Sequence, residues 1–293
     1  MQGFSMARRA RPAVWILLLA NLGLAALAGL PIYRGILRFT GYSLMSQKLA
    51  SGLSYDWLTD FLVNSPASLD RYAALIALVG FASIPVNTLL AGGVLGRFRD
   101  ADLQFSLAGF FRDVKRFGWR LIRLMILGLF CYWLVFLITN RGLRSLISSQ
   151  TNDWQDDRMV FALRLIAGLL CIAGLGFVNL AMDYARVKLV MEDGSSAAEA
   201  FLVSLGFSLG RLRKVVTVYA LPTLASVALL GIYWLVVPWS LINTPPAEGT
   251  WGQYREPLVV ALLFLGQQLV MFGRYWFRVA TWAGEWSYYG GSR

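Results

Sequence analysis

The stretch MVFALRLIAGLLCIAGLGFVNLAM, residues 159–182, carries a single charged side chain, Arg164. As a helix it is long enough to cross a hydrocarbon core about 30 Å thick, and five other stretches share this character. Because a bilayer offers no water to the backbone, helices are the expected structure of all six. We therefore predict an all-α integral membrane protein, a single polytopic domain over residues 1–293 with spans at about 13–30, 71–95, 121–138, 159–182, 215–237 and 257–272.

The composition agrees with a lipid environment. Hydrophobic residues make up 57% of the 293 residues and charged residues only 15%, outside the range of ordinary soluble domains. The net charge of +11 could indicate nucleic-acid binding, but the Lys and Arg residues lie beside the apolar stretches and form no separate basic domain. We expect no nucleic-acid partner, and we expect membrane lipids as partners.

Most of the 27 Lys and Arg residues fall on one side of this layout. That side holds both termini and the connections between spans two and three and between spans four and five. By the positive-inside rule it is cytoplasmic, so we predict a bacterial inner-membrane location with cytoplasmic N- and C-termini. The first span follows a basic start and is expected to end at Pro31, and a retained signal anchor is favoured over a cleaved signal peptide.

The connections between spans differ in character. The stretch from Tyr33 to Asp70 is expected to form one or two short helices at the membrane surface, and the stretch from Asn140 to Asp157 a short polar loop. The Asn243–Gly249 stretch is rich in turn-forming residues and is also predicted to be a loop.

The two cytoplasmic connections resemble each other. When Arg97 is aligned with Lys188, Asp102 meets Asp193, Phe110 meets Phe201, Arg120 meets Arg211 and Arg123 meets Lys214. Each copy has the pattern of an amphipathic helix, and the second begins with the capping-box spacing of Ser196 and Glu199. We predict two cytoplasmic-side amphipathic helices and an internal span-helix-span repeat, with a chance match of two amphipathic segments as the alternative.

Two charged residues at the fourth span are candidate site residues, Asp183 and Arg164. A carboxylate near membrane depth is often functional, but Arg186 lies one helical turn from Asp183, so a local ion pair is the favoured interpretation. The long side chain of Arg164 is expected to reach the headgroups by snorkelling, with pairing to Asp70 or Asp153 as the alternative.

Amide side chains occur within the spans. Asn87 in the second span and Gln267 in the sixth are candidates for hydrogen bonds between helices, together with Asn21, Asn179 and Gln268. The alternative is a polar path for a substrate, in which Asp183, Asn87 and Gln267 would face one cavity. Gly92 and Gly96 form a Gly-x-x-x-Gly pattern that permits close helix approach.

The sequence offers little for catalysis. The chain has no histidine, which removes the usual general base, the usual haem ligand and the commonest zinc ligand. No hydrolase, nucleotide-binding or metalloprotease motif is visible, and we predict neither catalytic residues nor a metal site. No cofactor is predicted, although a lipid or a pigment held by apolar contact leaves no motif.

One segment resembles a recurring bacterial pattern. It runs Asp183-Tyr184-Ala185-Arg186-Val187, then Val190-Met191-Glu192-Asp193-Gly194-Ser195 and Ala200-Phe201, into Arg211-Leu212-Arg213-Lys214. It resembles six-span inner-membrane families of unknown function, and is similar to the membrane domain that precedes the catalytic barrel in some bacterial glycerophosphodiester phosphodiesterases. The resemblance implies the membrane fold. The 293 residues hold no counterpart of that barrel, so no phosphodiesterase activity is carried over.

These observations favour a non-catalytic multi-pass subunit or scaffold that packs against other integral membrane proteins. The alternative is a transporter or lipid-translocating permease built on the repeat. An intramembrane enzyme comes third, because residues for acid–base chemistry are sparse.

Overall fold

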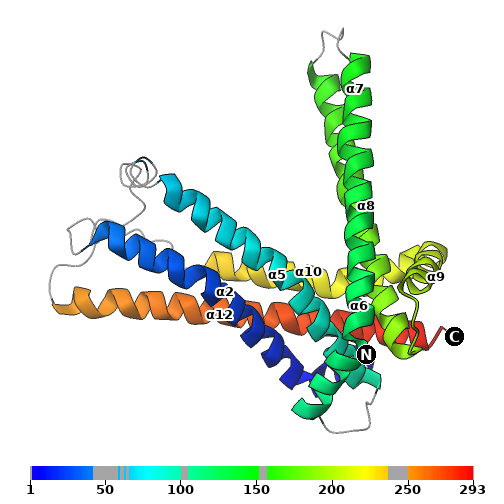
Figure 1. Ribbon diagram of the computed structural model, residues 1–293, viewed down its shortest axis with the longest axis horizontal. Helices are drawn as coiled ribbons and strands as arrows, with labels where there is room; N and C mark the ends of the chain where they lie inside the picture. The colour runs from blue at the N-terminus through cyan, green and yellow to red at the C-terminus, as the bar shows by residue number, and fades with distance from the viewer. Residues whose placement is uncertain are drawn as a thin grey trace. The chain divides into compact units, whose positions relative to one another are not determined.

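The structure is a computed structural model that describes residues 2–41, 59, 63, 66–99, 105–151, 157–236 and 250–292. Throughout these ranges the regular structure is helical, without a strand. The principal elements are α1 (Gln2–Arg9), α2 (Arg11–Thr40), α5 (Pro66–Arg99), α6 (Leu107–Phe136), the π-helix η1 (Leu137–Leu143), α7 (Arg144–Thr151), α8 (Asp157–Met191), α9 (Ala197–Gly210), α10 (Leu212–Val236) and α12 (Thr250–Gly290) (Figure 1).

Five helical stretches within the described ranges are long and apolar enough to cross a membrane. They are Arg11–Phe39, Asp70–Arg99, Leu107–Thr151, Arg158–Met191 and Leu212–Val236. The chain is therefore an all-α protein with the helices of a multi-pass membrane protein. The sixth predicted span, at about 257–272, lies inside the long helix α12.

The chain divides into two compact units, each described here by itself. Unit 1 comprises Met1–Ala10, Thr88–Pro222 and Val279–Arg293, and unit 2 comprises Arg11–Asn87 and Thr223–Arg278.

In unit 1, α6, η1 and α7 follow one another as a nearly continuous helix that lies alongside α8, and α9 packs on both α8 and α6 (Figure 1). Close approach to the end of α5 depends on Gly96, because a Cβ there would lie 2.5 Å from the Cβ of Asp113 on α6. Within this unit the predicted small-residue pattern thus serves packing inside the chain.

A chain of hydrogen bonds links three helices of unit 1. The Tyr132 hydroxyl on α6 donates to the Asn179 side-chain oxygen on α8 at 3.1 Å, and the Asn179 amide donates to the Tyr219 hydroxyl on α10 at 2.6 Å. Amides placed in this way satisfy one another between helices where water is excluded.

Unit 2 has an amide pair of the same kind. Asn21 on α2 and Asn87 on α5 exchange two side-chain hydrogen bonds, of 2.8 and 2.9 Å. Elsewhere in the unit the rings of Trp15 and Phe272 lie 4.8 Å apart, and the Arg11 guanidinium lies 5.5 Å from the centre of the Trp276 ring.

The helix that contains the first predicted span does not end at Pro31, since α2 continues to Thr40. A proline removes one backbone hydrogen bond and tends to kink a helix. Where water is scarce, the backbone groups beside the proline find no better hydrogen-bond partners than those within the helix. The helix therefore continues beyond the proline.

The polar loop predicted from Asn140 is also corrected, because the chain stays helical to Thr151. The polar side chains of α7 are satisfied locally: the Ser148 hydroxyl donates to the Ser145 carbonyl at 3.1 Å, and the Thr151 hydroxyl to the Ile147 carbonyl at 2.8 Å. Packing of α7 on α8 then favours helix over loop.

The two predicted amphipathic helices differ from each other. The second is α9, whose N-cap Ser196 accepts from the Glu199 backbone N–H at 3.3 Å, as the capping-box spacing predicts. The first is no separate helix, since it forms the opening turns of α6 and continues into the span. Where α9 ends at Gly210, the aligned position on α6 is Trp119, and a tryptophan tolerates a helix interior better than glycine does.

Three expectations lie outside the described residues. They are most of the surface helices between Tyr33 and Asp70, the Asn243–Gly249 loop, and the pairing of Asp102 with Asp193 in the repeat.

Candidate functional site at the C-terminal end of α8

The last turns of α8 are deeply buried. Asp183, Tyr184, Ala185, Val187, Leu189 and Val190 are each completely buried, and Lys188 nearly so. A charged side chain in such a place is costly unless it is paired. The partners of these charges therefore define the site.

Two ion pairs neutralise carboxylates in this region, one within α8 and one between α5 and α6. Arg186 donates to Asp183 at 2.7 Å across one helical turn, which is the local pair that the sequence predicts. On the adjoining helices, Arg97 of α5 forms a buried ion pair with Asp113 of α6, and its Nε lies 2.8 Å from an Asp113 carboxylate oxygen. Neither carboxylate is left as a lone buried charge.

The last turn of α8 is tied to the end of α12. Lys188 pairs with Glu192 one turn later, and the second carboxylate oxygen of Glu192 accepts a hydrogen bond of 2.8 Å from the Tyr289 hydroxyl. Glu192 thus joins a helix end to a residue almost a hundred positions further along the chain.

The turn that follows α8 has an unusual residue at its centre. The backbone N–H of Gly194 donates to the Leu189 carbonyl at 3.1 Å, which closes the helix with a Schellman-type bond. The residue that takes the left-handed conformation is Asp193, with φ of 55°, where glycine is the usual choice. The aspartate therefore holds this position at some backbone cost, which its side-chain contacts offset.

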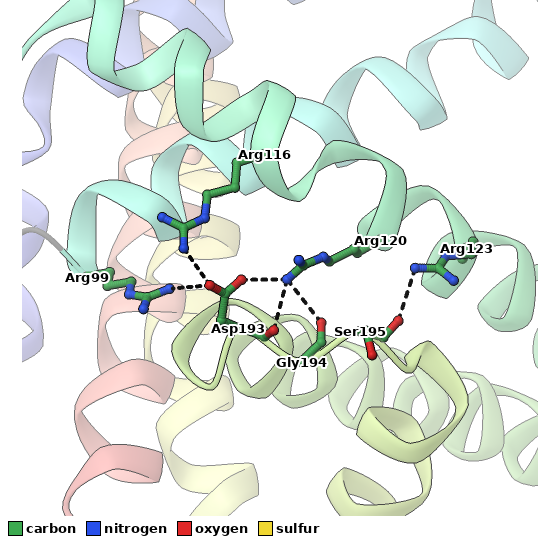
Figure 2. Close-up of polar contacts among 7 residues, drawn as sticks. All are labelled: Arg99, Arg116, Arg120, Arg123, Asp193, Gly194 and Ser195. Atoms are coloured by element: carbon green, nitrogen blue, oxygen red, sulfur yellow. Dashed lines mark hydrogen bonds and ion pairs between the residues drawn. The ribbon is translucent and has the colours of Figure 1, made fainter.

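Those contacts are with arginines. We call Arg99, Arg116, Arg120 and Arg123 the arginine cluster. Figure 2 shows the Asp193 carboxylate between Arg99, Arg116 and Arg120: it forms ion pairs with Arg116 and Arg120, and Arg99 lies 3.5 Å away.

Backbone carbonyls of the turn complete the contacts of the cluster. Arg120 donates to the carbonyls of Asp193 at 3.0 Å and Gly194 at 3.3 Å, and Arg123 to that of Ser195 at 3.0 Å (Figure 2). The hydrogen bond from Arg120, opposed by partial burial and reinforced by Arg116, holds the pKa of Asp193 below its usual value. The carboxylate is therefore charged at neutral pH, and the guanidinium groups of Arg99, Arg116 and Arg120 face it.

A second carboxylate is buried near Asp183. Glu285 on α12 is completely buried, and both Glu285 and Asp183 lie within electrostatic range of the Tyr184 phenol. Two carboxylates and a phenol in one buried region can hold or move a proton. The sequence analysis did not select Glu285, although an acid among Trp282, Trp286 and Tyr289 was a usable signal.

The remaining predicted site residues lie elsewhere. Asn87 pairs with Asn21 and donates to the Ser83 carbonyl at 2.8 Å in unit 2, whereas the side chain of Gln267 is exposed on α12. Arg164 is exposed on the N-terminal half of α8. Of the five predicted site residues, the structure brings only Asp183 and Arg186 into contact.

No family model, no curated protein and no solved structure matches this chain. The resemblance to the membrane domain of glycerophosphodiester phosphodiesterases therefore stays a prediction.

Proposed function

We propose that this protein is a non-catalytic multi-pass subunit or scaffold of a larger membrane protein complex. The observation that carries the proposal is the surface of its long helices. On α8 alone, large apolar side chains between Met159 and Ile172 are more than half exposed: Met159, Phe161, Leu165, Ile166, Leu169, Leu170 and Ile172. Lipid or the helices of other membrane proteins must cover this surface.

The site at the end of α8 supports the same proposal. Several of its charges are paired with neighbours within the chain, as in the pairs of Arg97 with Asp113 and of Lys188 with Glu192. Such pairs hold helix ends in place. They fix the ends of the long helices relative to one another within unit 1.

A six-span topology in a bacterial inner membrane, with cytoplasmic termini, is part of the proposal. It is supported by the length of α12, which runs for 41 residues and includes the apolar stretch 257–272. The topology can be tested with single cysteines placed at the start of α2, the end of α7 and the end of α12. Their accessibility to a labelling reagent is measured from each side of the membrane. Labelling of both termini from the cytoplasmic side is expected, and labelling of the two termini from opposite sides would exclude six spans.

The internal repeat is likewise supported by burial. Residues aligned between the two copies are buried together: Leu90 and Ala181, Ala91 and Met182, Val94 and Ala185, Phe98 and Leu189, Phe110 and Phe201, and Leu124 and Val215. A chance match of apolar patterns does not require the same positions to face a core in both copies.

Extraction of the protein from native membranes in a mild detergent, followed by sizing and mass spectrometry, tests the subunit proposal. A constant set of co-migrating membrane proteins is expected, and it should be lost when exposed residues of α8 such as Leu169 and Ile172 are replaced by bulky tryptophan. A chain that migrates alone, unaffected by those substitutions, would contradict the proposal.

The buried carboxylates favour a second candidate, a proton-linked transporter. Asp183 and Glu285 are both completely buried, and buried acids are common in the proton relays of transporters. In proteoliposomes that contain an entrapped pH-sensitive dye, a transporter would speed proton entry down an imposed gradient. Glu285→Gln would abolish the effect and Arg144→Gln would not; equal rates with and without protein would remove this candidate.

A further inference from the structure

The arginine cluster carries more positive charge than its internal partner neutralises. Three guanidinium groups, those of Arg99, Arg116 and Arg120, face the Asp193 carboxylate, which is the carboxylate they pair with in the described part of the chain. Further contacts of the cluster are to the neutral backbone carbonyls of Asp193, Gly194 and Ser195. The Arg116 side chain is 50% exposed and that of Arg99 37%. Donors of both side chains therefore remain open to an external anion.

We propose that the arginine cluster binds the phosphate of an anionic phospholipid headgroup, such as that of phosphatidylglycerol. Guanidinium groups form paired, charge-assisted hydrogen bonds with phosphate oxygens, and several of them around one anion give both affinity and orientation. Arg99 ends α5 and the other three arginines follow one another along α6, so the site is held by packed helices.

The neighbouring surface favours a lipid as the source of the phosphate. Trp119 lies between Arg116 and Arg120 in sequence and is 68% exposed, as an aromatic residue at a membrane interface is. Past Arg123 the helix presents the exposed apolar side chains Ile126 and Phe130. Contacts for a headgroup and contacts for an acyl chain thus follow one another along a single helix. A free phosphate ion would have no use for the apolar contacts.

Asp193 acts as an internal competitor for the lipid phosphate. Its carboxylate occupies Arg116 and Arg120, and its left-handed backbone keeps it in that place. Removing its charge with Asp193→Asn, which keeps a residue suited to the left-handed conformation, frees these donors. The variant is therefore expected to bind anionic lipid more tightly than the natural chain, whereas a purely structural cluster would only lose stability.

The test uses the full chain in a mild detergent, titrated with phosphatidylglycerol or phosphatidylcholine and observed by native mass spectrometry. Phosphatidylglycerol is expected to be retained preferentially. Arg116→Gln should weaken its binding by about five-fold, the loss of one arginine near a membrane surface, and Asp193→Asn should strengthen it. Arg144→Gln is the matched control, because it removes an exposed arginine from α7, roughly 30 Å along the helix from Arg123.

Three results would overturn the proposal. They are equal retention of the two lipids, an Arg116→Gln variant that binds as Arg144→Gln does, and glycerol phosphate displacing phosphatidylglycerol at comparable concentration, which would indicate a site for soluble phosphate. As a control, a cooperative thermal unfolding transition is measured for each variant to establish that it is folded. The inference rests on membrane insertion and not on a complex, so partner proteins lost or retained in the extraction experiment leave this result unaffected.

Discussion

The two halves of α8 are both rich in aliphatic residues but have opposite environments. From Met159 to Ile172 most large apolar side chains are exposed, whereas from Val178 to Val190 most side chains are buried, those of Asp183 and Lys188 included. Leu, Ala and Val recur in both stretches, and the buried stretch carries three charged residues against one in the exposed stretch, so hydrophobicity does not identify the buried half. The difference is that the C-terminal half packs against α9 and its neighbours, whereas the large apolar side chains of the N-terminal half are exposed on unit 1. Burial along α8 therefore depends on contacts with other helices of the chain. An apolar sequence predicts only that a stretch avoids water.

The same substitution made in both halves tests the difference in packing most directly. Leu189→Ala removes a completely buried side chain and is expected to lower the free energy of unfolding by about 2–5 kcal/mol. Leu169→Ala, at a side chain 57% exposed, should cost less than about 0.5 kcal/mol. Thermal or denaturant unfolding in detergent measures both. Equal losses would mean that the exposed half is also packed in the isolated chain.

Two glycines test the same difference in packing. Gly96→Ala places a Cβ against the Cβ of Asp113, an atom close to the backbone, and is expected to cost about 1–3 kcal/mol. Gly168→Ala on the exposed half of α8 meets no atom within 4 Å, so the better helix propensity of alanine should leave stability equal or slightly higher. The same unfolding assay applies, and a harmless Gly96→Ala would show that α5 and α6 are not closely packed.

The Asp193 turn predicts a pH dependence. The pKa of Asp193 is lowered in the folded chain, so its stabilisation is fully present above the unfolded value near 3.9 and is lost as the pH falls through the folded pKa. Asp193→Asn should lower stability by up to about 1 kcal/mol at neutral pH, as for other partly exposed ion pairs. The difference between the two chains should shrink only below about pH 4. A difference that is constant down to lower pH would show that the arginines do not act on this carboxylate.

A small effect is expected at the boundary between the two halves. Asn179→Leu removes the hydrogen bonds to Tyr132 and Tyr219, and such bonds between membrane helices average about 0.6 kcal/mol. Tyr132→Phe and Tyr219→Phe, measured in the same unfolding assay, give each bond separately. A loss several times larger would place Asn179 in a more extended polar network.

Much of this architecture is predictable from sequence, because apolar length and capping are local properties. The helices around residues 71–95 and 159–182 and the start of α9 at Ser196 follow from them directly. Continuity is harder to predict: α2 passes Pro31 because water is scarce there, and α7 replaces a loop because it packs on α8.

The candidate site shows the same limit. The pair of Asp183 and Arg186 is separated by three residues and is predictable, whereas the contacts of Glu192 with Tyr289 and of Asp193 with Arg116 and Arg120 join distant parts of the chain. A single sequence gives no measure of such proximity.

The π-helical stretch η1 has a geometric consequence for the helix that follows it. A π-turn accommodates an extra residue in an α-helix, and one residue corresponds to a rotation of about 100° about the axis. Every side chain of α7 therefore points in a direction that an uninterrupted α6 would not give it, and that direction is the one in which α7 meets α8. Insertions or deletions of single residues between Leu137 and Leu143 would act as an angular adjustment, changing which face of α7 meets its neighbour while leaving the length of the hairpin almost the same.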